Sequence, residues 1–281
     1  MKEYSGMFPP PLLHRILCTI CRPKMFVLSL LAVALWAGCD GDDDSPKVKC
    51  TGSTALFKKQ CVDVGDIVTF GTYPQSTSTP EALQWRVLDI DSANRKLLLL
   101  SEYVIDAKPY NTEFISITWE KCTLRTWLND TFKTAAFTSS EQKQIALTPL
   151  ENPDNPSYGT DGGNATNDYV FLLSLADALS QTDDVAGSGK YFRSDAERQA
   201  DATRYAVQNG AHVYGSESGN RANDATCTDV HCFAYWWLRS PGLSSTYAAN
   251  VDLGGDVCIN NESGCVDNTD MGVRPALWVK Y

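Results

Sequence analysis

The sequence has few histidines and no cluster of basic residues. Only three of its 281 residues are histidine, and its formal net charge at pH 7 is −10. Residues 1–38 contribute a net +3, and removing this from −10 leaves −13 for the remainder. An acidic chain without a basic stripe repels a phosphate backbone. We therefore exclude nucleic acid as a partner.

The motifs of common catalytic and metal sites are also missing. The chain has neither a Gly-rich phosphate-binding loop nor a Gly-x-Ser-x-Gly nucleophile motif, and its cysteine spacings do not match a zinc site. His212 and His231 lie in polar stretches, where Asp229 could orient the imidazole of His231. We therefore name no catalytic and no metal-binding residue. Whether the protein is an enzyme stays open, and non-catalytic binding is favoured.

The apolar run near the N-terminus is too short to cross a bilayer easily. Residues 25–38 follow Arg15, Arg22 and Lys24 and have the length of a signal-peptide core. The run ends at Cys39, as in bacterial lipoprotein signals, which it resembles and in which the cysteine is lipidated. We predict a signal peptide over 1–38, an acidic tether over 39–49, and a lipid-anchored protein exposed on the bacterial cell envelope. A secreted protein or an uncleaved membrane anchor is the alternative.

Export would make disulfides available to the cysteines that follow residue 39. Three pairs are close in the sequence: Cys50 with Cys61, Cys227 with Cys232, and Cys258 with Cys265. Such pairs would each staple one loop. Cys122 is left over in a predicted helix, and we expect it to be a buried thiol rather than a nucleophile.

Strand-like patterns come first, helical patterns follow, and strand-like patterns return at the end. Alternation predicts strands over 66–73, 83–90 and 96–105, with a further short strand over 169–173. Helical spacing and capping motifs predict helices that contain Leu124, Trp127, Leu128 and Phe132, and others over 142–147, 174–179 and 194–210. This order favours a single α+β domain over residues 50–281, in which N- and C-terminal strands share a sheet.

The segment from Trp236 to Trp278 has apolar ends and a polar centre. Its ends, WWLRSPG and GVRPALW, each carry one arginine next to apolar residues. A buried arginine needs an acid or a carbonyl as its partner, and its planar guanidinium commonly locks loops. We predict Trp237, Arg239 and Arg274 as the structural frame of this segment, since tryptophan pairs usually pack in the core.

The centre, residues 243–269, has the composition of an adaptable binding loop, which is also that of any solvated loop. Rigid borders and a Cys258–Cys265 disulfide would lower the entropy lost on binding. The candidate ligand-binding residues are Ser244, Ser245, Tyr247, Asn250, Asp252, Asp256, Asn260 and Asn261. We expect no cofactor. The alternative is calcium, bound by oxygen atoms of Asp252, Asp256, Glu262, Asp267, Asn268 and Asp270, although their spacing is not that of an EF-hand.

The two ends of this segment belong to a larger set of sequence motifs. Together with DIVTFGTYPQ, LQWRVLDI, LLLLSEYVID, LRTWLNDTF, FLLS and Tyr205-Ala206, they resemble an uncharacterised family of bacterial exported domains, from about Val64 onward. The ending, with Gly272-Val273-Arg274 in place of a Gly-Phe-Arg motif, resembles the formylglycine-generating-enzyme branch of the C-type lectin-like fold. This resemblance implies that fold, with a mixed sheet from N- and C-terminal strands and helices in the middle.

The same fold is used by variable proteins of diversity-generating retroelements, whose C-terminal segment is diversified and forms an exposed binding face. Residues 243–269 have the matching position. The resemblance therefore implies a display protein that recognises an unknown protein or carbohydrate ligand at the cell surface. A formylglycine-generating-type oxidase, or another cell-envelope enzyme, is the alternative, and a structural cell-envelope protein without a ligand is the third possibility. For that oxidase, neither Cys227 with Cys232 nor Cys258 with Cys265 matches the expected cysteine pair in both position and spacing.

Overall fold

The structure, a computed structural model, describes residues 50, 54–179, 190–213, 232–260 and 264–281. All of them belong to one unit that begins at Pro46. The predicted signal peptide, the tether and the lipidation site at Cys39 lie outside the described residues. Among the residues that are described, no helix is long and apolar enough to cross a membrane.

The first sheet joins strands from the two ends of the domain. Its order is β14-β5-β4-β3, with every pair antiparallel. The strands are β3 (Ile67–Pro74), β4 (Pro80–Asp91), β5 (Lys96–Ser101) and β14 (Ala276–Lys280). Residues 97–100 of β5 form an unbroken run of leucines because both faces of this strand are buried. The prediction that N- and C-terminal strands share a sheet is confirmed, and the domain is α+β.

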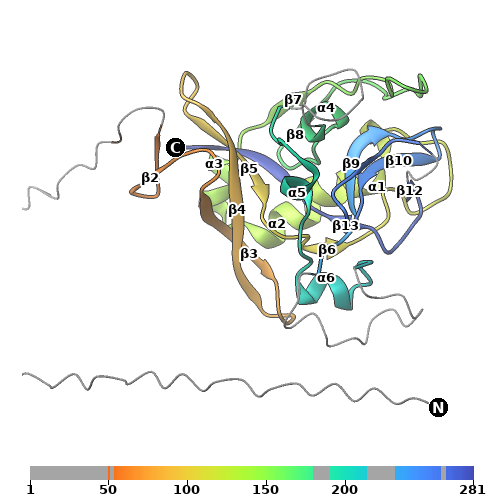
Figure 1. Cartoon of the computed structure of the whole chain (residues 1–281). Helices are drawn as coiled ribbons and strands as arrows, with labels where there is room; N and C mark the ends of the chain where they lie inside the picture. Colours follow the sequence, from red (N-terminus) through yellow and green to blue (C-terminus); the bar gives the residue numbers. More distant parts are fainter. Residues whose placement is uncertain (1–49, 51–53, 180–189, 214–231, 261–263) are drawn as a thin grey trace, which may run out of the picture. The chain divides into compact units, whose positions relative to one another are not determined.

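The second sheet contains the mixed pairing. Its order is β11-β10-β9-β13-β6, and β12 also pairs with β10. Its strands are β6 (Asp106–Ala107), β9 (Trp236–Pro241), β10 (Tyr247–Val251), β11 (Val257–Cys258), β12 (Gly264–Cys265) and β13 (Gly272–Val273). Only β9 and β13 are parallel among the described pairs of this sheet. This sheet also joins β6, which precedes the helices, to C-terminal strands, so the predicted mixed sheet from N- and C-terminal strands is present, whereas the first sheet that the two ends share is antiparallel throughout. In Figure 1, β9, β10 and β13 are the blue strands to the right of β4.

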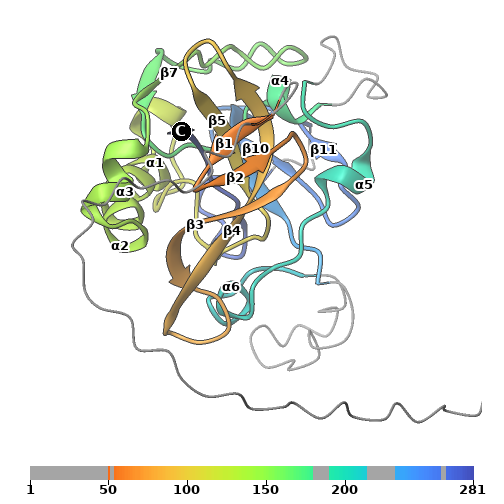
Figure 2. The same cartoon turned by 90° about the vertical axis from the view of Figure 1, so that its left-hand side faces the viewer.

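Helices from the middle of the chain lie on one side of the first sheet (Figure 2). They are η1 (Trp119–Lys121), α1 (Thr123–Trp127), the π-helical turn η2 (Leu128–Phe132), α2 (Lys133–Ala136) and α3 (Ser139–Gln144). Leu124, Leu128 and Phe132 are buried, as their helical spacing predicts. Phe137, which follows α2, packs against Phe70 of β3 with ring centroids 5.2 Å apart. Burying a side chain of this size stabilises the fold by about 1.5–3 kcal/mol.

Three short helices follow, and their bounds correct one prediction. They are α4 (Leu175–Ala178), α5 (Asp195–Arg198) and α6 (Arg204–Gln208). The single helix predicted over 194–210 is wrong, because Thr203 caps a separate helix by accepting a hydrogen bond from the Ala206 amide at 3.1 Å. Between the two helices, the Ala202 amide donates to the Cys232 carbonyl at 2.8 Å, and Ala202 bridges Val104. This long-range backbone pairing replaces the helical hydrogen bonds.

Two hairpins complete the described chain. They are β1 (Ala55–Phe57) with β2 (Gln60–Val62), and β7 (Thr148–Leu150) with β8 (Thr166–Asp168). A disulfide joins Cys50 to Cys61, as predicted. The strand predicted over 169–173 is wrong, because β8 ends at Asp168 and only Phe171 beyond it forms a bridge, with Ala276.

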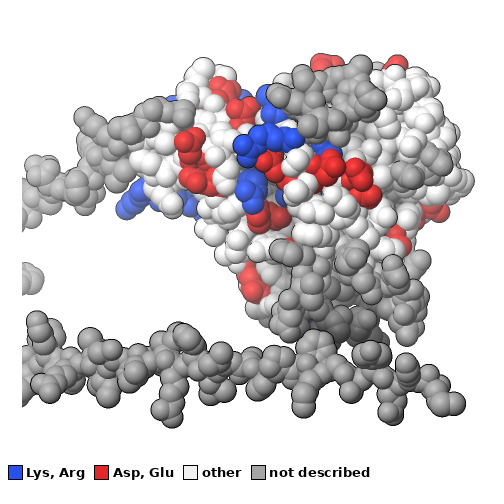
Figure 3. All heavy atoms as spheres, viewed as in Figure 1, with Lys and Arg blue, Asp and Glu red and all other residues white. Residues whose placement is uncertain are grey.

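Charged side chains are unevenly spread over the face shown in Figure 3. Lysine and arginine gather over the region of β4 and α5, with aspartate and glutamate at their borders. The chain as a whole carries −10, so this basic group stands out against the charge of the molecule.

Candidate functional site

The frame of the C-terminal segment is built into the second sheet. Trp237 is fully buried in β9, and its indole N–H donates to the Lys108 carbonyl at 2.9 Å. Its ring lies edge-on to Tyr110, with centroids 5.8 Å apart. A side chain at position 264 would come within 2.6 Å of the Trp237 ring, so the glycine there allows β12 to pass. Trp237 therefore holds the segment from within the core.

Arg239 ties β9 to the segment that contains α4. Its guanidinium donates to the Leu172 carbonyl and to Asp177 Oδ2, both at 2.9 Å. Asp177 also accepts from Ser174 and so completes the capping box of α4. The Asp177 carboxylate thus caps α4 and also binds the buried guanidinium of Arg239. Arg239 therefore has an acid and a carbonyl as partners, as the sequence predicts.

Arg274 lies deeper and binds backbone carbonyls. It donates to Ser101 at 3.0 Å and to Arg198 at 3.0 Å, and its guanidinium lies 5.1 Å from the centroid of the Trp236 ring. Burial lowers the pKa of Arg274 to about 10. The group therefore stays charged at neutral pH, and it connects β5, α5 and β13 from within the core.

A third buried arginine was not predicted. Arg198, at the end of α5, is fully buried and donates to the carbonyls of Gly255 and Ala178. Gly255 has a φ of +91°, and a Cβ at this position would lie 2.0 Å from the Asp195 carbonyl oxygen. Only glycine fits so close to α5. Arg198 thus fixes the turn that follows β10.

The structure divides the predicted ligand-binding residues. Asn250 is only 1% exposed, because it lies within β10 between Trp237 of β9 and Cys258 of β11, so its side chain is not at the surface where a ligand contact was predicted. Asp252 accepts the amides of Gly254 and Asp256 at 2.8 Å and so shapes the turn around Gly255. Asp256 itself is exposed and Asn260 is half-buried, whereas Asn261 lies outside the described residues.

The remaining candidates, Ser244, Ser245 and Tyr247, form a second turn at the other end of β10. Tyr247 opens the strand and Asp252 follows its end, so about 16 Å of extended chain separates them. The predicted residues therefore belong to two places on the molecule. The turn at Ser244–Tyr247 lies beside another exposed loop.

That neighbouring loop, residues 111–117, is bonded directly to the turn. The Ile117 amide donates to the Ser245 carbonyl at 2.9 Å, and the Ser245 hydroxyl donates to Ser116 Oγ at 2.9 Å. At the tip of the loop, Phe114 is 55% exposed and Ile115 is 46% exposed. We call the exposed parts of residues 112–117 and 243–247 the loop surface. Sequence reasoning missed Phe114 and Ile115, which show no periodicity and lie far from Tyr247 in the chain.

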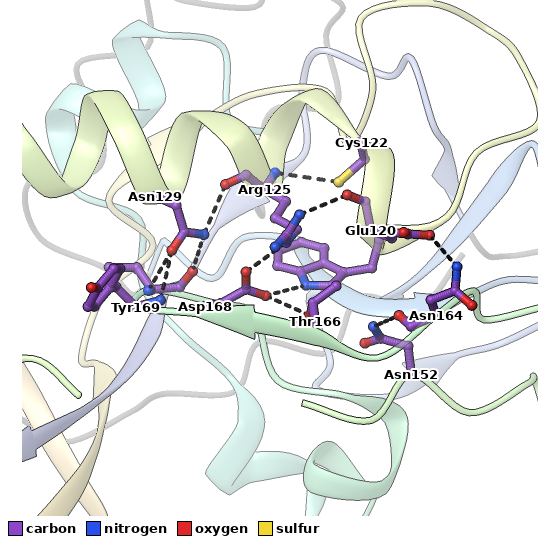
Figure 4. A network of polar contacts seen from close by, with 11 residues as sticks. Glu120, Cys122, Arg125, Asn129, Asn152, Asn164, Thr166, Asp168 and Tyr169 are labelled. Carbon is purple, nitrogen blue, oxygen red and sulfur yellow. Dashed lines mark hydrogen bonds and ion pairs between the residues drawn. The ribbon is translucent and has the colours of Figure 1, made fainter. Parts of the chain in front are cut away.

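Below the loop surface, a buried polar network fixes the chain that leads into α1 (Figure 4). Asp168 accepts hydrogen bonds from Arg125 Nε at 2.7 Å, from Trp119 Nε1 at 2.9 Å and from the Thr166 hydroxyl at 2.9 Å. Cys122 lies beside this group, where burial raises its pKa to about 12. It is a buried thiol, as predicted, and it is protonated at neutral pH.

The predicted Cys258–Cys265 disulfide is absent from the structure. Cys258 lies opposite Asn250 and Cys265 lies opposite Tyr247, both along the same edge of β10. Three residues of extended strand span about 10 Å, whereas disulfide-bonded Cα atoms lie about 4.4–6.8 Å apart. Cys227 lies outside the described residues, so the Cys227–Cys232 pair stays a prediction.

We expect alkylation of the native protein to label Cys265, which is partly exposed, and to leave Cys122 unlabelled until the protein unfolds. Non-reducing peptide mapping should recover Cys50 linked to Cys61 as the internal positive control. A peptide in which Cys258 is linked to Cys265 would contradict the register of β11 and β12.

Calcium binding is the alternative for the C-terminal segment. Among the described residues, no three His, Cys, Asp or Glu side chains lie close enough together to hold a metal ion. Asp252 and Asp256 share one turn, whereas Asp270 lies 4.0 Å from His212. Glu262 lies outside the described residues.

The model of one protein family, described as a domain of unknown function (DUF6273), matches residues 94–281, which is more than half of the chain. The chain belongs to this family. The DUF6273 match begins just before β5 and includes both ends of the Trp236–Trp278 segment, as well as the loop surface. Strands β3 and β4, which complete the first sheet, precede the matched region. Neither the curated proteins nor the solved structures give a match.

Proposed function

We propose that this DUF6273 domain recognises a protein or carbohydrate partner through the loop surface. The observation that carries the proposal is the exposure of Phe114 and Ile115 on a loop whose backbone is bonded to the Ser244–Tyr247 turn. Neighbouring large apolar side chains beside hydroxyl groups are typical of binding contacts, in which an apolar centre is bordered by polar groups.

The structure beneath the loop surface favours recognition because it holds the loops in place before a partner arrives. Trp119, two residues after Ile117, is anchored by Asp168. On the other side, the Val266 amide donates to the Thr246 carbonyl at 3.0 Å, and the Gly242 amide donates to the Tyr247 carbonyl at 2.8 Å. Loops that are already ordered lose less entropy on binding, so more of the contact energy contributes to affinity.

The proposal also includes a fold family, a variable segment and a lipid anchor. A C-type lectin-like fold of the formylglycine-generating-enzyme type accounts for a sheet shared by both ends of the domain and for the buried Arg274 of the closing motif. In a variable protein of a diversity-generating retroelement, the turn at Ser244–Tyr247 would change its side chains while Trp237, Arg239 and Arg274 stay constant. We further propose that lipidation at Cys39 presents this surface on the bacterial cell envelope.

We expect the double substitution F114S/I115S to weaken partner binding at least about tenfold, since each buried large apolar contact contributes more than about 1 kcal/mol at an interface centre. The purified protein would be used to select ligands from a random-peptide phage library and from an array of defined glycans. Dissociation constants of the selected ligands would then be compared between the original and the substituted protein.

The control is Leu147→Ser, which removes an equally exposed apolar side chain, 53% accessible, outside the loop surface. We expect its ligand affinities to stay within twofold of the original, by the weak effect of surface substitutions. Ligands that bind F114S/I115S as tightly as they bind the original protein would contradict the proposal, as would a failure of both selections.

A further inference from the structure

A cleft that shares no residue with the loop surface lies between β4 and the segment that leads into α5. Its volume is about 650 Å³, within the range of small-molecule sites. Arg86 of β4 and Glu102 line one side, while Lys190, Arg193 and Glu197 line the other. The buried guanidinium of Arg274 lies at its base, among the lining residues.

The charge of this cleft is opposite to that of the molecule. Its lining includes four cationic side chains, Arg86, Lys190, Arg193 and Arg274, against two acids, Glu102 and Glu197. The whole chain carries −10. In Figure 3, lysine and arginine gather over the region of β4 and α5, the two elements that border the cleft, with acidic residues beside them. Asp89, outside the lining, pairs with Lys190 at 3.1 Å and reduces the excess of positive charge in the lining, but the excess stays positive and favours anionic ligands.

The arginines keep hydrogen-bond donors available to a ligand. Arg193 directs Nε and Nη2 to a single oxygen, Glu197 Oε1, at 2.8 and 2.7 Å, while its side chain is 89% exposed. A guanidinium has five N–H donors, so most of those on Arg193 face solvent. Arg86 pairs with Glu102, and its positive charge adds to the burial that lowers the pKa of Arg274.

Apolar side chains give the cleft a second kind of wall. Val64, Leu88, Tyr191 and Phe192 are among the lining residues, and Val64 is 57% exposed. An inorganic anion would contact the guanidinium groups but leave this wall unused. We infer that the cleft binds a small organic acid, whose carboxylate or phosphate group contacts Arg86 and Arg193 while its ring or carbon body lies against Val64 and Tyr191.

The test is calorimetric titration of the purified full chain with glucuronate, 4-hydroxybenzoate, inorganic phosphate and uncharged glucose. We expect at least one of the two ring acids to bind with millimolar or tighter affinity, more tightly than phosphate, and glucose not to bind. Arg193→Gln should weaken the binding about tenfold or more, because it removes a charge-assisted contact. Arg86→Gln should act in the same direction, and 0.5 M NaCl should weaken the binding by screening.

The matched control is Arg204→Gln, since Arg204 is exposed on α6 and does not line this cleft. Its affinities should stay within twofold of the original. The inference is overturned if neither ring acid binds at 10 mM, if both R193Q and R86Q bind the acid unchanged, or if phosphate binds as tightly as the ring acids. Because the loop surface and the cleft have no residue in common, failure of one test leaves the other unaffected.

Discussion

Replacement of Arg274 with alanine is expected to lower the free energy of unfolding by at least about 3 kcal/mol. The guanidinium is 2% exposed and donates to the carbonyls of Ser101 and Arg198, both at 3.0 Å. Truncation removes these donors from buried acceptors and leaves a cavity beside Trp236. Urea unfolding followed by tryptophan fluorescence would measure the change, with a fall in the midpoint and little change in the slope.

The control for Arg274→Ala is the same chemical change at an exposed position, Arg204→Ala on α6. There we expect a change within about 0.5 kcal/mol, as for most surface substitutions. Ser245→Ala on the loop surface should cost no more than its one exposed hydrogen bond, about 1 kcal/mol. Equal unfolding midpoints for Arg274→Ala and Arg204→Ala would show that the buried guanidinium does not hold the frame. If Arg274→Ala does not fold, Arg274→Lys, which keeps the charge but not the planar fork, supplies a measurable intermediate.

Of the three arginines that are buried in the described part of the chain, the sequence predicts two, because their neighbours are distinctive. Arg239 and Arg274 each lie among apolar residues, so burial follows from their surroundings. Arg198 lies in the polar stretch DAERQAD, and its local sequence is that of an exposed helix. Its burial comes from the approach of Gly255, which is 57 residues away, to the end of α5. Because the contact joins residues so far apart in the chain, no local sequence pattern predicts that Arg198 is buried.

One predicted ligand-binding residue, Asn250, is buried for a related reason. Residues 248–251 are all buried, because β10 has a neighbour on each edge and is covered on both faces, so its sequence shows no alternation. Composition therefore placed Asn250 on the surface, although it is as buried as the alanines beside it. Phe114 and Ile115 present the converse case, because apolar residues predict burial but here lie at the tip of a loop. Which strand is central and which loop is outermost depends on the assembled sheet.

Cys258 and Cys265 show how proximity in sequence can mislead. A short separation in the chain makes loop closure easy, and it favours a local disulfide when nothing is known of the fold. The structure instead places both cysteines along one edge of β10, opposite Asn250 and Tyr247. The extended spacing of that strand, rather than the length of the connecting loop, sets the distance between them.

Replacement of Asp168 with alanine is expected to cost about 3–5 kcal/mol, because it leaves the buried part of Arg125 without its counter-charge. Asp168 is fully buried, and it also accepts from Trp119 and Thr166. The matched control is Glu197→Ala, which removes the acid from the surface pair with Arg193 and should cost about 1 kcal/mol or less. Urea unfolding of the two variants compares the loss of a carboxylate–arginine ion pair whose acid is buried with the loss of such a pair at the surface.

Asp168→Asn separates the two roles of this carboxylate. The amide keeps one oxygen acceptor and nearly the original volume but loses the charge, so an intermediate cost would assign the remainder to the charge. Because Trp119 follows the loop that carries Phe114 and Ile115, Asp168→Ala should also speed hydrogen exchange of the Ile117 amide, which donates to Ser245. If Asp168→Ala lowers the free energy of unfolding no more than Glu197→Ala does, and hydrogen exchange at the Ile117 amide is unchanged, then Asp168 neither stabilises the fold through its charge nor orders the loop surface. The loop surface would then depend on its own turn for order, and the anchoring of Trp119 would be incidental to recognition.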